Sequence, residues 1–296
     1  MYSAINKNKI KTVVIIAAFI AVISAIGAVF SYTLDSPSIF IPVLIFAIVY
    51  SVVGYFASAK MAIAMTGAKE VTKKEAPRLY RTVENLTITA GMPMPKVYIV
   101  NDPAPNAFAT GRDPYHGVVA ATTGLLEILD DNELEGVMAH EISHVQNYDI
   151  RVNSIVIALV TVVALLSDFL LRIGFWGGGN RGGGVNAIAL GLAIAAAIIA
   201  PIIAVMLQMA VSRKREFLAD ASGSLLTRYP DGLASALRKI ESYARPMKKA
   251  NDATAHLFIS NPFGKEKRGK AIRKLFSTHP PTDARVQQLQ KMGDKL

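Results

Sequence analysis

The chain has 296 residues, of which 52% are hydrophobic and only 18% are charged. This composition is too apolar for an ordinary soluble domain and favours an integral membrane protein. The formal net charge of +10 comes without the aromatic–basic motifs of nucleic-acid-binding proteins, so we expect no nucleic-acid partner. Cysteine is absent, which excludes disulfide bonds, a thiolate nucleophile and thiolate metal ligands.

Two uncharged apolar runs lie near the start of the chain, at residues 12–34 and 36–59. Each is longer than the roughly 20 residues that a membrane-spanning helix requires, and the first is too long for a cleaved signal peptide. Lysines precede the first run and follow the second, whereas the connection between them has neither lysine nor arginine. The positive-inside rule therefore predicts a transmembrane hairpin over residues 1–60, with the amino terminus in the cytoplasm.

The next segment, residues 61–151, is polar and is predicted to form part of a cytoplasmic domain. Residues 96–100 alternate as a strand does, and residues 106–111 and 118–121 are predicted to be two further short strands. The edge of such a sheet can hold an extended peptide by accepting it as an additional strand. An ordinary hairpin packed on the core explains the same pattern, so both interpretations stay open at this point.

The central motif of the chain is HEISH, within a helix predicted over residues 130–149. His140 and His144 lie one turn apart on one face of this helix, where two imidazoles can share a tetrahedral zinc ion. Glu141 points beside the metal, where it can take a proton from a water molecule. Two surface histidines on an ordinary helix are the alternative interpretation.

The rest of this helix indicates where it lies. Asp130 and Glu133 at its start have the spacing of a capping box. One side is apolar and is predicted to dock into a core through Leu134, Met138, Ile142 and Val145. The remaining positions are rich in acids and amides, which places the helix outside the bilayer and argues against a protease that works within the membrane.

Two further apolar runs, residues 152–171 and 185–212, flank a glycine-rich stretch at residues 177–184. The glycine-rich stretch is predicted to be a loop outside the cell, and the basic residues after the fourth run mark a return to the cytoplasm. We therefore predict a second transmembrane hairpin over residues 152–212 and a second cytoplasmic segment over residues 213–296. A hairpin buried in protein rather than lipid is the alternative for these two runs.

A catalytic zinc site uses three protein ligands and one open position, so another part of the chain must supply a ligand. Glu216 and Asp220 are four residues apart and share one face of a predicted helix. One of them can bind the metal while the other accepts a hydrogen bond from a ligating histidine, or both are solvated acids balanced by arginines. His279 can fold over the site to stabilise an oxyanion, or it is a loop histidine before a proline-initiated helix.

Four motifs in this order resemble the HtpX family of membrane-bound zinc metalloproteases. They are NAFATG at residues 106–111, HEISH at residues 140–144, REFLAD at residues 215–220 and HPPTDAR at residues 279–285. The interleaved apolar runs match as well, so the resemblance extends over nearly the whole chain and implies a gluzincin fold.

The resemblance also implies roles for individual residues. His140, His144 and Glu216 are expected to bind one zinc ion per chain, with Glu141 as the catalytic base and Asp220 as a support for a ligating histidine. The expected substrate-binding edge strand consists of Asn106, Ala107, Phe108, Ala109, Thr110 and Gly111. The implied activity is endoproteolysis of misfolded or damaged membrane proteins on the cytoplasmic side.

The sequence thus predicts an α-helical integral membrane protein with four transmembrane helices and a cytoplasmic, mainly α, zincin-like metalloprotease domain with a small β-sheet. Its expected partners are the lipid bilayer and protein substrates. It is expected in the cell membrane, with the active site and both termini in the cytoplasm. A prenyl-protein endoprotease is a rival interpretation, but its large chamber needs more spans. A catalytically silent adaptor with a structural zinc ion is another, but it needs no base at Glu141.

Overall fold

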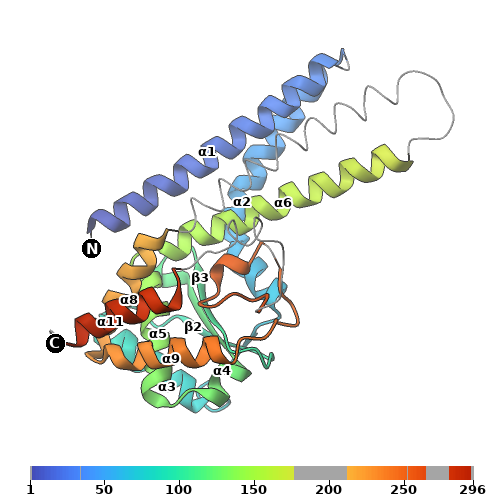
Figure 1. Cartoon of the computed structure of the whole chain (residues 1–296). Helices are drawn as coiled ribbons and strands as arrows, with labels where there is room; N and C mark the ends of the chain where they lie inside the picture. Colours follow the sequence, from blue (N-terminus) through green and yellow to red (C-terminus); the bar gives the residue numbers. More distant parts are fainter. Residues whose placement is uncertain (1, 34, 177–211, 252, 265–279, 295–296) are drawn as a thin grey trace.

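The structure, a computed structural model, describes residues 2–33, 35–176, 212–251, 253–264 and 280–294. Three long helices extend from a part that contains a small sheet and the remaining helices (Figure 1). The long helices are α1 (Tyr2–Thr33), α2 (Phe40–Thr66) and α6 (Asp149–Trp176).

Helices α1 and α2 correspond to the first two predicted spans. Both are long and apolar enough to cross a membrane, over Ile5–Ala28 and Pro37–Thr66. Only 28% and 17% of their most apolar stretches are buried inside the protein, whereas a core helix of a soluble protein is mostly buried. The large apolar side chains exposed on α2 are Ile41, Ile45, Phe46, Ile48, Val49, Val52, Val53 and Phe56. These exposed faces suit contact with lipid.

Helix α6 contains the third predicted run and packs against both α1 and α2. Its buried residues Val152 and Ile155 share one apolar cluster with Ile15 and Phe19 of α1. The glycine-rich stretch and, apart from Ser212, the fourth run lie outside the described residues. Within the described part of the chain, two helices meet the length and hydropathy of a membrane span, and the four-span topology stays a prediction.

The globular part is built around the helix that carries the HEISH motif. This helix is α5 (Asp131–Gln146), and it contacts helices on several sides and the sheet. The other helices here are α3 (Pro77–Ala90), α4 (Thr123–Ile128), α8 (Arg213–Thr227), α9 (Pro230–Ser242) and α11 (Thr282–Gly293). Gly136 lets α9 approach α5 closely, because a Cβ at this position would lie 2.6 Å from the backbone nitrogen of Leu233.

The sheet has four strands in the order β1–β2–β4–β3. Strands β2 (Lys96–Val100) and β4 (Gly117–Thr122) are parallel, whereas β1 (Lys69–Glu70) and β3 (Ala107–Gly111) pair antiparallel at the two sides. The three strands predicted from the sequence are confirmed to within one residue at each end. Strand β1 was not predicted, because two charged residues carry no strand pattern of their own.

The two faces of the sheet are covered by different parts of the chain, since side chains alternate along each strand. On one face, Ala109 and Val119 pack into the core that contains α3, α5 and α9. On the other face, Phe108 contacts Phe258 with ring centroids 5.3 Å apart, and Ile157 of α6 joins the same cluster. Strand β3 is therefore an edge strand held between α5 and the first turns of α6.

The two ends of α5 differ from each other. Its start has the predicted capping box, with reciprocal hydrogen bonds between Asp130 and Glu133. The predicted continuation of the helix to Asp149 is wrong, since α5 ends at Gln146 and α6 begins at Asp149. Between them Tyr148 adopts φ = 61°, a left-handed conformation that interrupts the helical ladder and changes the direction of the chain.

Candidate metal centre

The two histidine rings of α5 meet at one point. His140 Nε2 and His144 Nε2 are 3.1 Å apart, and both residues are buried. The Nδ1 atom of each ring faces a carboxylate: Asp220 at 2.9 Å from His140, and Asp149 at 3.0 Å from His144. Because a carboxylate accepts, the network assigns a proton to each Nδ1 and leaves the lone pair of each Nε2 directed at the shared point.

Helix α8 brings a carboxylate to this point. Glu216 Oε2 lies 3.7 Å from His140 Nε2, and Oε1 lies 3.6 Å from His144 Nε2. One donor atom from each of the three residues lies within 4.8 Å of the other two. The approach depends on Gly223, where a Cβ would be 2.9 Å from the backbone nitrogen of His140. Only glycine lets the backbone of α8 come this close to α5.

This donor set fits a zinc ion. Two nitrogens bound tetrahedrally at about 2 Å lie about 3.3 Å apart, close to the 3.1 Å between His140 Nε2 and His144 Nε2. Two imidazoles and one carboxylate are typical of catalytic zinc, which keeps a fourth position open. Carboxylates on the far nitrogens of both rings are the outer partners that metal-binding histidines usually have.

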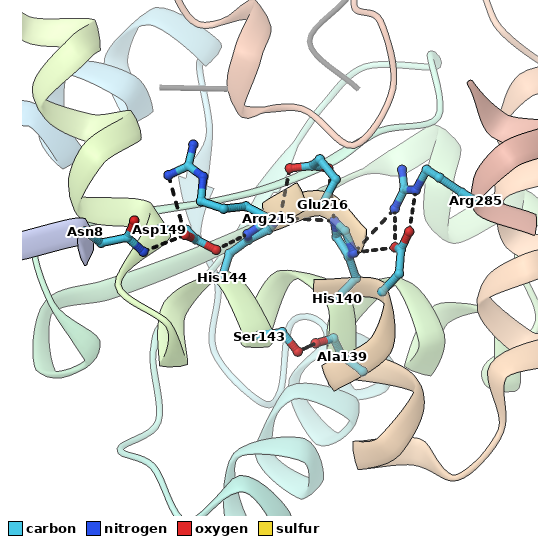
Figure 2. A network of polar contacts seen from close by, with 10 residues as sticks. Asn8, Ala139, His140, Ser143, His144, Asp149, Arg215, Glu216 and Arg285 are labelled. Atoms are coloured by element: carbon cyan, nitrogen blue, oxygen red, sulfur yellow. Dashed lines mark hydrogen bonds and ion pairs between the residues drawn. The ribbon is translucent and has the colours of Figure 1, made fainter. Parts of the chain in front are cut away.

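His140 is anchored within the globular part by an ion pair (Figure 2). Arg285 of α11 is only 2% exposed and donates to both oxygens of Asp220, with Nε to Oδ2 at 2.9 Å and Nη2 to Oδ1 at 2.6 Å. Burial alone would raise the pKa of Asp220, but Arg285 and the His140 hydrogen bond outweigh it and hold this pKa at about 2. Arg285 Nη2 also lies 3.3 Å from His140 Nδ1, a contact between two donors that Asp220 bridges.

His144 is anchored at the junction with the long helices. Asp149 Oδ2 accepts from His144, while Asp149 Oδ1 accepts from Asn8 Nδ2 at 2.7 Å and lies 3.5 Å from Arg215 Nη1. Asn8 belongs to α1, so the chain of contacts in Figure 2 runs from a long apolar helix to the histidine ring.

The charges around the two rings favour a cation. Burial lowers the pKa of His140 to about 4. Burial also disfavours a charged His144, but the hydrogen bond to Asp149 and the charge of Glu216 outweigh it and raise the pKa of His144 to about 9. The acids around His144 therefore stabilise positive charge on its side of the shared point, and a divalent cation provides that charge without a proton.

Glu141 lies between α5 and the edge strand. Its side chain is 1% exposed, and burial raises its pKa to about 7. The backbone N–H of Ala109 in β3 faces this carboxylate and offsets a small part of the rise in pKa. A carboxyl group with a pKa near neutral can both accept and return a proton at physiological pH.

The first residues of the predicted edge strand are covered by the protein itself. The side chain of Asn106 exchanges two hydrogen bonds with the backbone of Ser260, at 2.9 and 3.1 Å. The carbonyl of Ala107 accepts from the N–H of Ile259 at 2.9 Å. A peptide cannot pair with these groups unless the segment around Ile259 moves.

The last residues of the strand are covered as well. The hydroxyl of Ser154 in α6 bonds to both the N–H and the carbonyl of Gly111, each at 3.0 Å, and to the hydroxyl of Thr110 at 2.9 Å. Ala109 lies between the two covered ends, next to Glu141. The contact surface offered by the strand is therefore shorter than the predicted residues 106–111.

The structure brings together His140, Glu141, His144, Glu216 and Asp220, the set that the family resemblance implied. His279 lies outside the described residues. Sequence reasoning missed three partners: Asp149, Arg285 and Asn8. Asp149 follows the HEISH motif closely and Arg285 ends the HPPTDAR motif, so both were visible as candidates. Nothing in the sequence connects Asn8 with the site.

Comparison with known proteins agrees with this geometry. Residues 73–293 match peptidase family M48. The chain is 53% identical over 296 residues to "Protease HtpX homolog" of Tropheryma whipplei (strain TW08/27), covering 100% of both chains. It is 43% identical over 299 residues to the protein of that name from Ligilactobacillus salivarius (strain UCC118), covering 99% of this chain and 100% of the relative.

A solved structure shares the fold. The crystal structure of S. mikatae Ste24p superposes with a TM-score of 0.53 at 17% identity, over 98% of this chain and 67% of that chain. The full-length identities, the M48 match, the apolar helices and the buried histidine–glutamate cluster support one assignment. The chain therefore belongs to peptidase family M48, among the HtpX proteases, and is a membrane-associated metalloprotease.

Proposed function

We propose that this protein is a zinc-dependent endopeptidase that cleaves misfolded or damaged membrane proteins on the cytoplasmic side of the cell membrane. The observation that carries the proposal is the convergence of His140 Nε2, His144 Nε2 and the Glu216 carboxylate within 4.8 Å, with Glu141 beside them. In this proposal the first three hold one zinc ion, and Asp220 fixes the ring of His140.

The catalytic work of the protein itself centres on Glu141. A zinc ion at this site supplies Lewis acidity, which makes water acidic near neutral pH and polarises a carbonyl group. Glu141 accepts a proton from the attacking water and then returns it to the leaving amine, in keeping with its pKa of about 7. His279 is proposed, from the sequence alone, to donate a hydrogen bond to the tetrahedral oxyanion.

The substrate is proposed to bind as an extended strand along β3. The sequence suggested residues 106–111 for this role, and the hydrogen bonds at both ends of the strand favour a contact centred on Ala109. A peptide paired there would lie near Glu141, since the backbone of Ala109 is close to that carboxylate. Recognition through backbone atoms at one short window is compatible with substrates of varied sequence.

The proposed orientation rests on the charge of the first long helix and on its contacts. Asn8 lies among Lys7, Lys9 and Lys11, and it bonds to the backbone of Asn147 immediately after α5. The lysine-rich end of α1 and the metal centre are thus on the same side of any membrane that α1 crosses. The positive-inside rule makes that side the cytoplasm.

The first test of the proposal is Glu141→Gln. This variant keeps every metal ligand but removes the proton acceptor, so zinc content should stay near that of the wild type while cleavage of casein by detergent-purified protein falls below detection. A chelator should also stop the wild type, and added zinc should restore it. Turnover of casein by Glu141→Gln near the wild-type rate would remove Glu141 from the mechanism. Full zinc binding with no chelator-sensitive cleavage by the wild type would favour the silent adaptor.

The orientation can be tested with single cysteines, since the chain has none of its own. Ser38 is exposed in the connection between α1 and α2, and Tyr115 is 80% exposed in the globular part. In intact cells, an impermeant thiol reagent should label Ser38→Cys and not Tyr115→Cys, and lysis should expose both. Labelling of Tyr115→Cys from outside would place the metal centre on the other side of the membrane.

A further inference from the structure

The turn that follows α5 is held in a strained conformation. Tyr148 has φ = 61°, a left-handed conformation that a residue with a Cβ rarely adopts and that persists only where the surroundings enforce it. The result of this turn is that Asp149, five residues after His144, comes back to within 3.0 Å of its Nδ1. A continuous helix would carry Asp149 onto a different face, away from the ring.

The side chains that contact this turn come from the first long helix. Asn8 is 3% exposed and donates to the backbone carbonyl of Asn147 at 2.9 Å and to Asp149 Oδ1 at 2.7 Å. The next residue, Lys9, places its Nζ 5.2 Å from the ring centroid of Tyr148. Two consecutive residues of α1 thus touch all three residues of the turn.

Asn8 is well placed to fix the orientation of the Asp149 carboxylate. One oxygen of that carboxylate accepts from His144, and the other accepts from Asn8 at 2.7 Å, a shorter contact than the 3.5 Å to Arg215. With both oxygens engaged, the carboxylate cannot rotate without breaking a buried hydrogen bond. The Asn8 amide therefore sets the direction in which the His144 ring presents Nε2.

We propose that the first membrane helix is a structural component of the metal centre: Asn8 is a positioning residue that, through Asp149, holds His144 in its metal-binding orientation. This inference rests on the proposed role of His144 as a ligand. It implies that the site has full metal affinity only when α1 is seated against the turn. A chain whose first helix is not in place has a weakened site, so proteolytic competence follows correct assembly in the membrane.

The test measures zinc affinity on the full chain in detergent, by competition with a chromophoric chelator. The variants are Asn8→Leu, which suits an apolar helix, and Asn8→Ala, which removes the amide with the smallest side chain. Thr12→Val is the matched control, because Thr12 is also buried in α1 but bonds to the Asn8 carbonyl of its own helix. Thermal unfolding of each protein without metal confirms equal folding.

We expect both Asn8 variants to bind zinc about tenfold more weakly, since one hydrogen bond to a charged group is lost. Asp149→Asn should cost about 10–100-fold, as outer partners of metal-binding histidines do. The absorption spectrum of bound cobalt should shift in the Asn8 variants and not in Thr12→Val. Casein cleavage should fall at limiting zinc and recover at saturating zinc.

The outcomes separate this inference from the proposed function. Wild-type zinc affinity and cobalt spectrum in both Asn8 variants would overturn the inference while leaving the metal site intact. A loss as large in Thr12→Val would overturn it too, because general disturbance of α1 would then explain the effect. Unchanged zinc binding by His144→Ala would instead overturn the proposed function. If Asn8→Ala unfolds, the result for Asn8→Leu decides alone.

Discussion

The two ends of α5 are stabilised in different ways. At its start, Asp130 and Glu133 cap the helix reciprocally, and Glu133 also accepts from Ser235 and Lys239 of α9. At its end, the turn at Tyr148 depends on α1, a helix far away in the sequence. Local sequence therefore specifies the start, whereas a tertiary contact with a long apolar helix specifies the end.

The two histidines differ in the same way, one being supported within the globular part and the other by a contact with α1. His140 lies toward the body of the globular part and is supported by a buried ion pair between Asp220 and Arg285. His144 lies at the end of α5 and is supported by Asp149, which a neutral amide of α1 holds. One half of the metal centre belongs to the folded core, and the other half depends on how the core meets the membrane helices.

The largest effect on zinc affinity is expected from substitution of Glu216. Because Glu216 lies near both histidines, its loss affects both halves of the site equally. Glu216→Ala leaves two histidines and solvent as ligands, and we expect zinc affinity to fall by more than about 100-fold with loss of activity. Asp220→Ala removes only an outer partner and should cost about 10–100-fold, with partial activity in excess zinc. Zinc affinities measured on the two purified variants test this expectation. Tight zinc binding by Glu216→Ala together with weak zinc binding by Asp220→Ala would make Asp220 the ligand and Glu216 the outer partner.

The next effect concerns the ion pair behind His140. Arg285→Ala leaves the buried Asp220 carboxylate without its cation, so we expect the free energy of unfolding to fall by about 3–5 kcal/mol. Lys239→Ala is the control, because Lys239 also pairs with a buried acid, Glu133, but its side chain is 41% exposed and the loss should be much smaller. Thermal or denaturant unfolding in detergent measures both. Similar small losses in the two variants would show that the Arg285 pair contributes little.

The smallest effect is at the capped start of α5. Glu133→Ala removes the reciprocal cap and the contacts with α9, which should cost about 1–2 kcal/mol of stability. Zinc affinity should stay unchanged, since this end does not touch the histidines. A fall in zinc affinity as large as that of an Asn8 variant would show that the two ends are not independent.

The same residue gives a dependence on pH. Burial alone would raise the pKa of Glu133, but hydrogen bonds from Lys239, Ser235 and the Asp130 N–H outweigh it and lower the pKa. Because the folded pKa is below the unfolded value, the stabilisation is complete above about pH 4.5 and is lost as the pH falls below it. The melting temperature of Glu133→Gln should therefore fall less than that of the wild type when the pH is lowered from about 6 to about 3.5.

The parts of the site predicted from the sequence share a physical feature: their information is local. The capping box is a motif of four consecutive residues, and the two histidines one turn apart and the shared face of Glu216 and Asp220 follow from helical periodicity. The roles of Glu216 and Asp220 in the site came from the family resemblance. The end of α5 was mispredicted because Tyr148 has no local reason to leave the helix. Asn8 and Arg285 could not be assigned for the same reason, since their roles arise only when α1 and α11 pack against α5 and α8.

Strand β3 also affects whether two copies of this protein can associate through the edges of their sheets. A protease that receives peptides along a strand must keep one sheet edge accessible, and open edges invite edge-to-edge association. Here Ile259 and Ser154 occupy the backbone groups at the two ends of the strand. The opposite edge strand, β1, is only two residues long and carries Lys69 and Glu70. Two copies of the sheet therefore lack a continuous ladder through which to join.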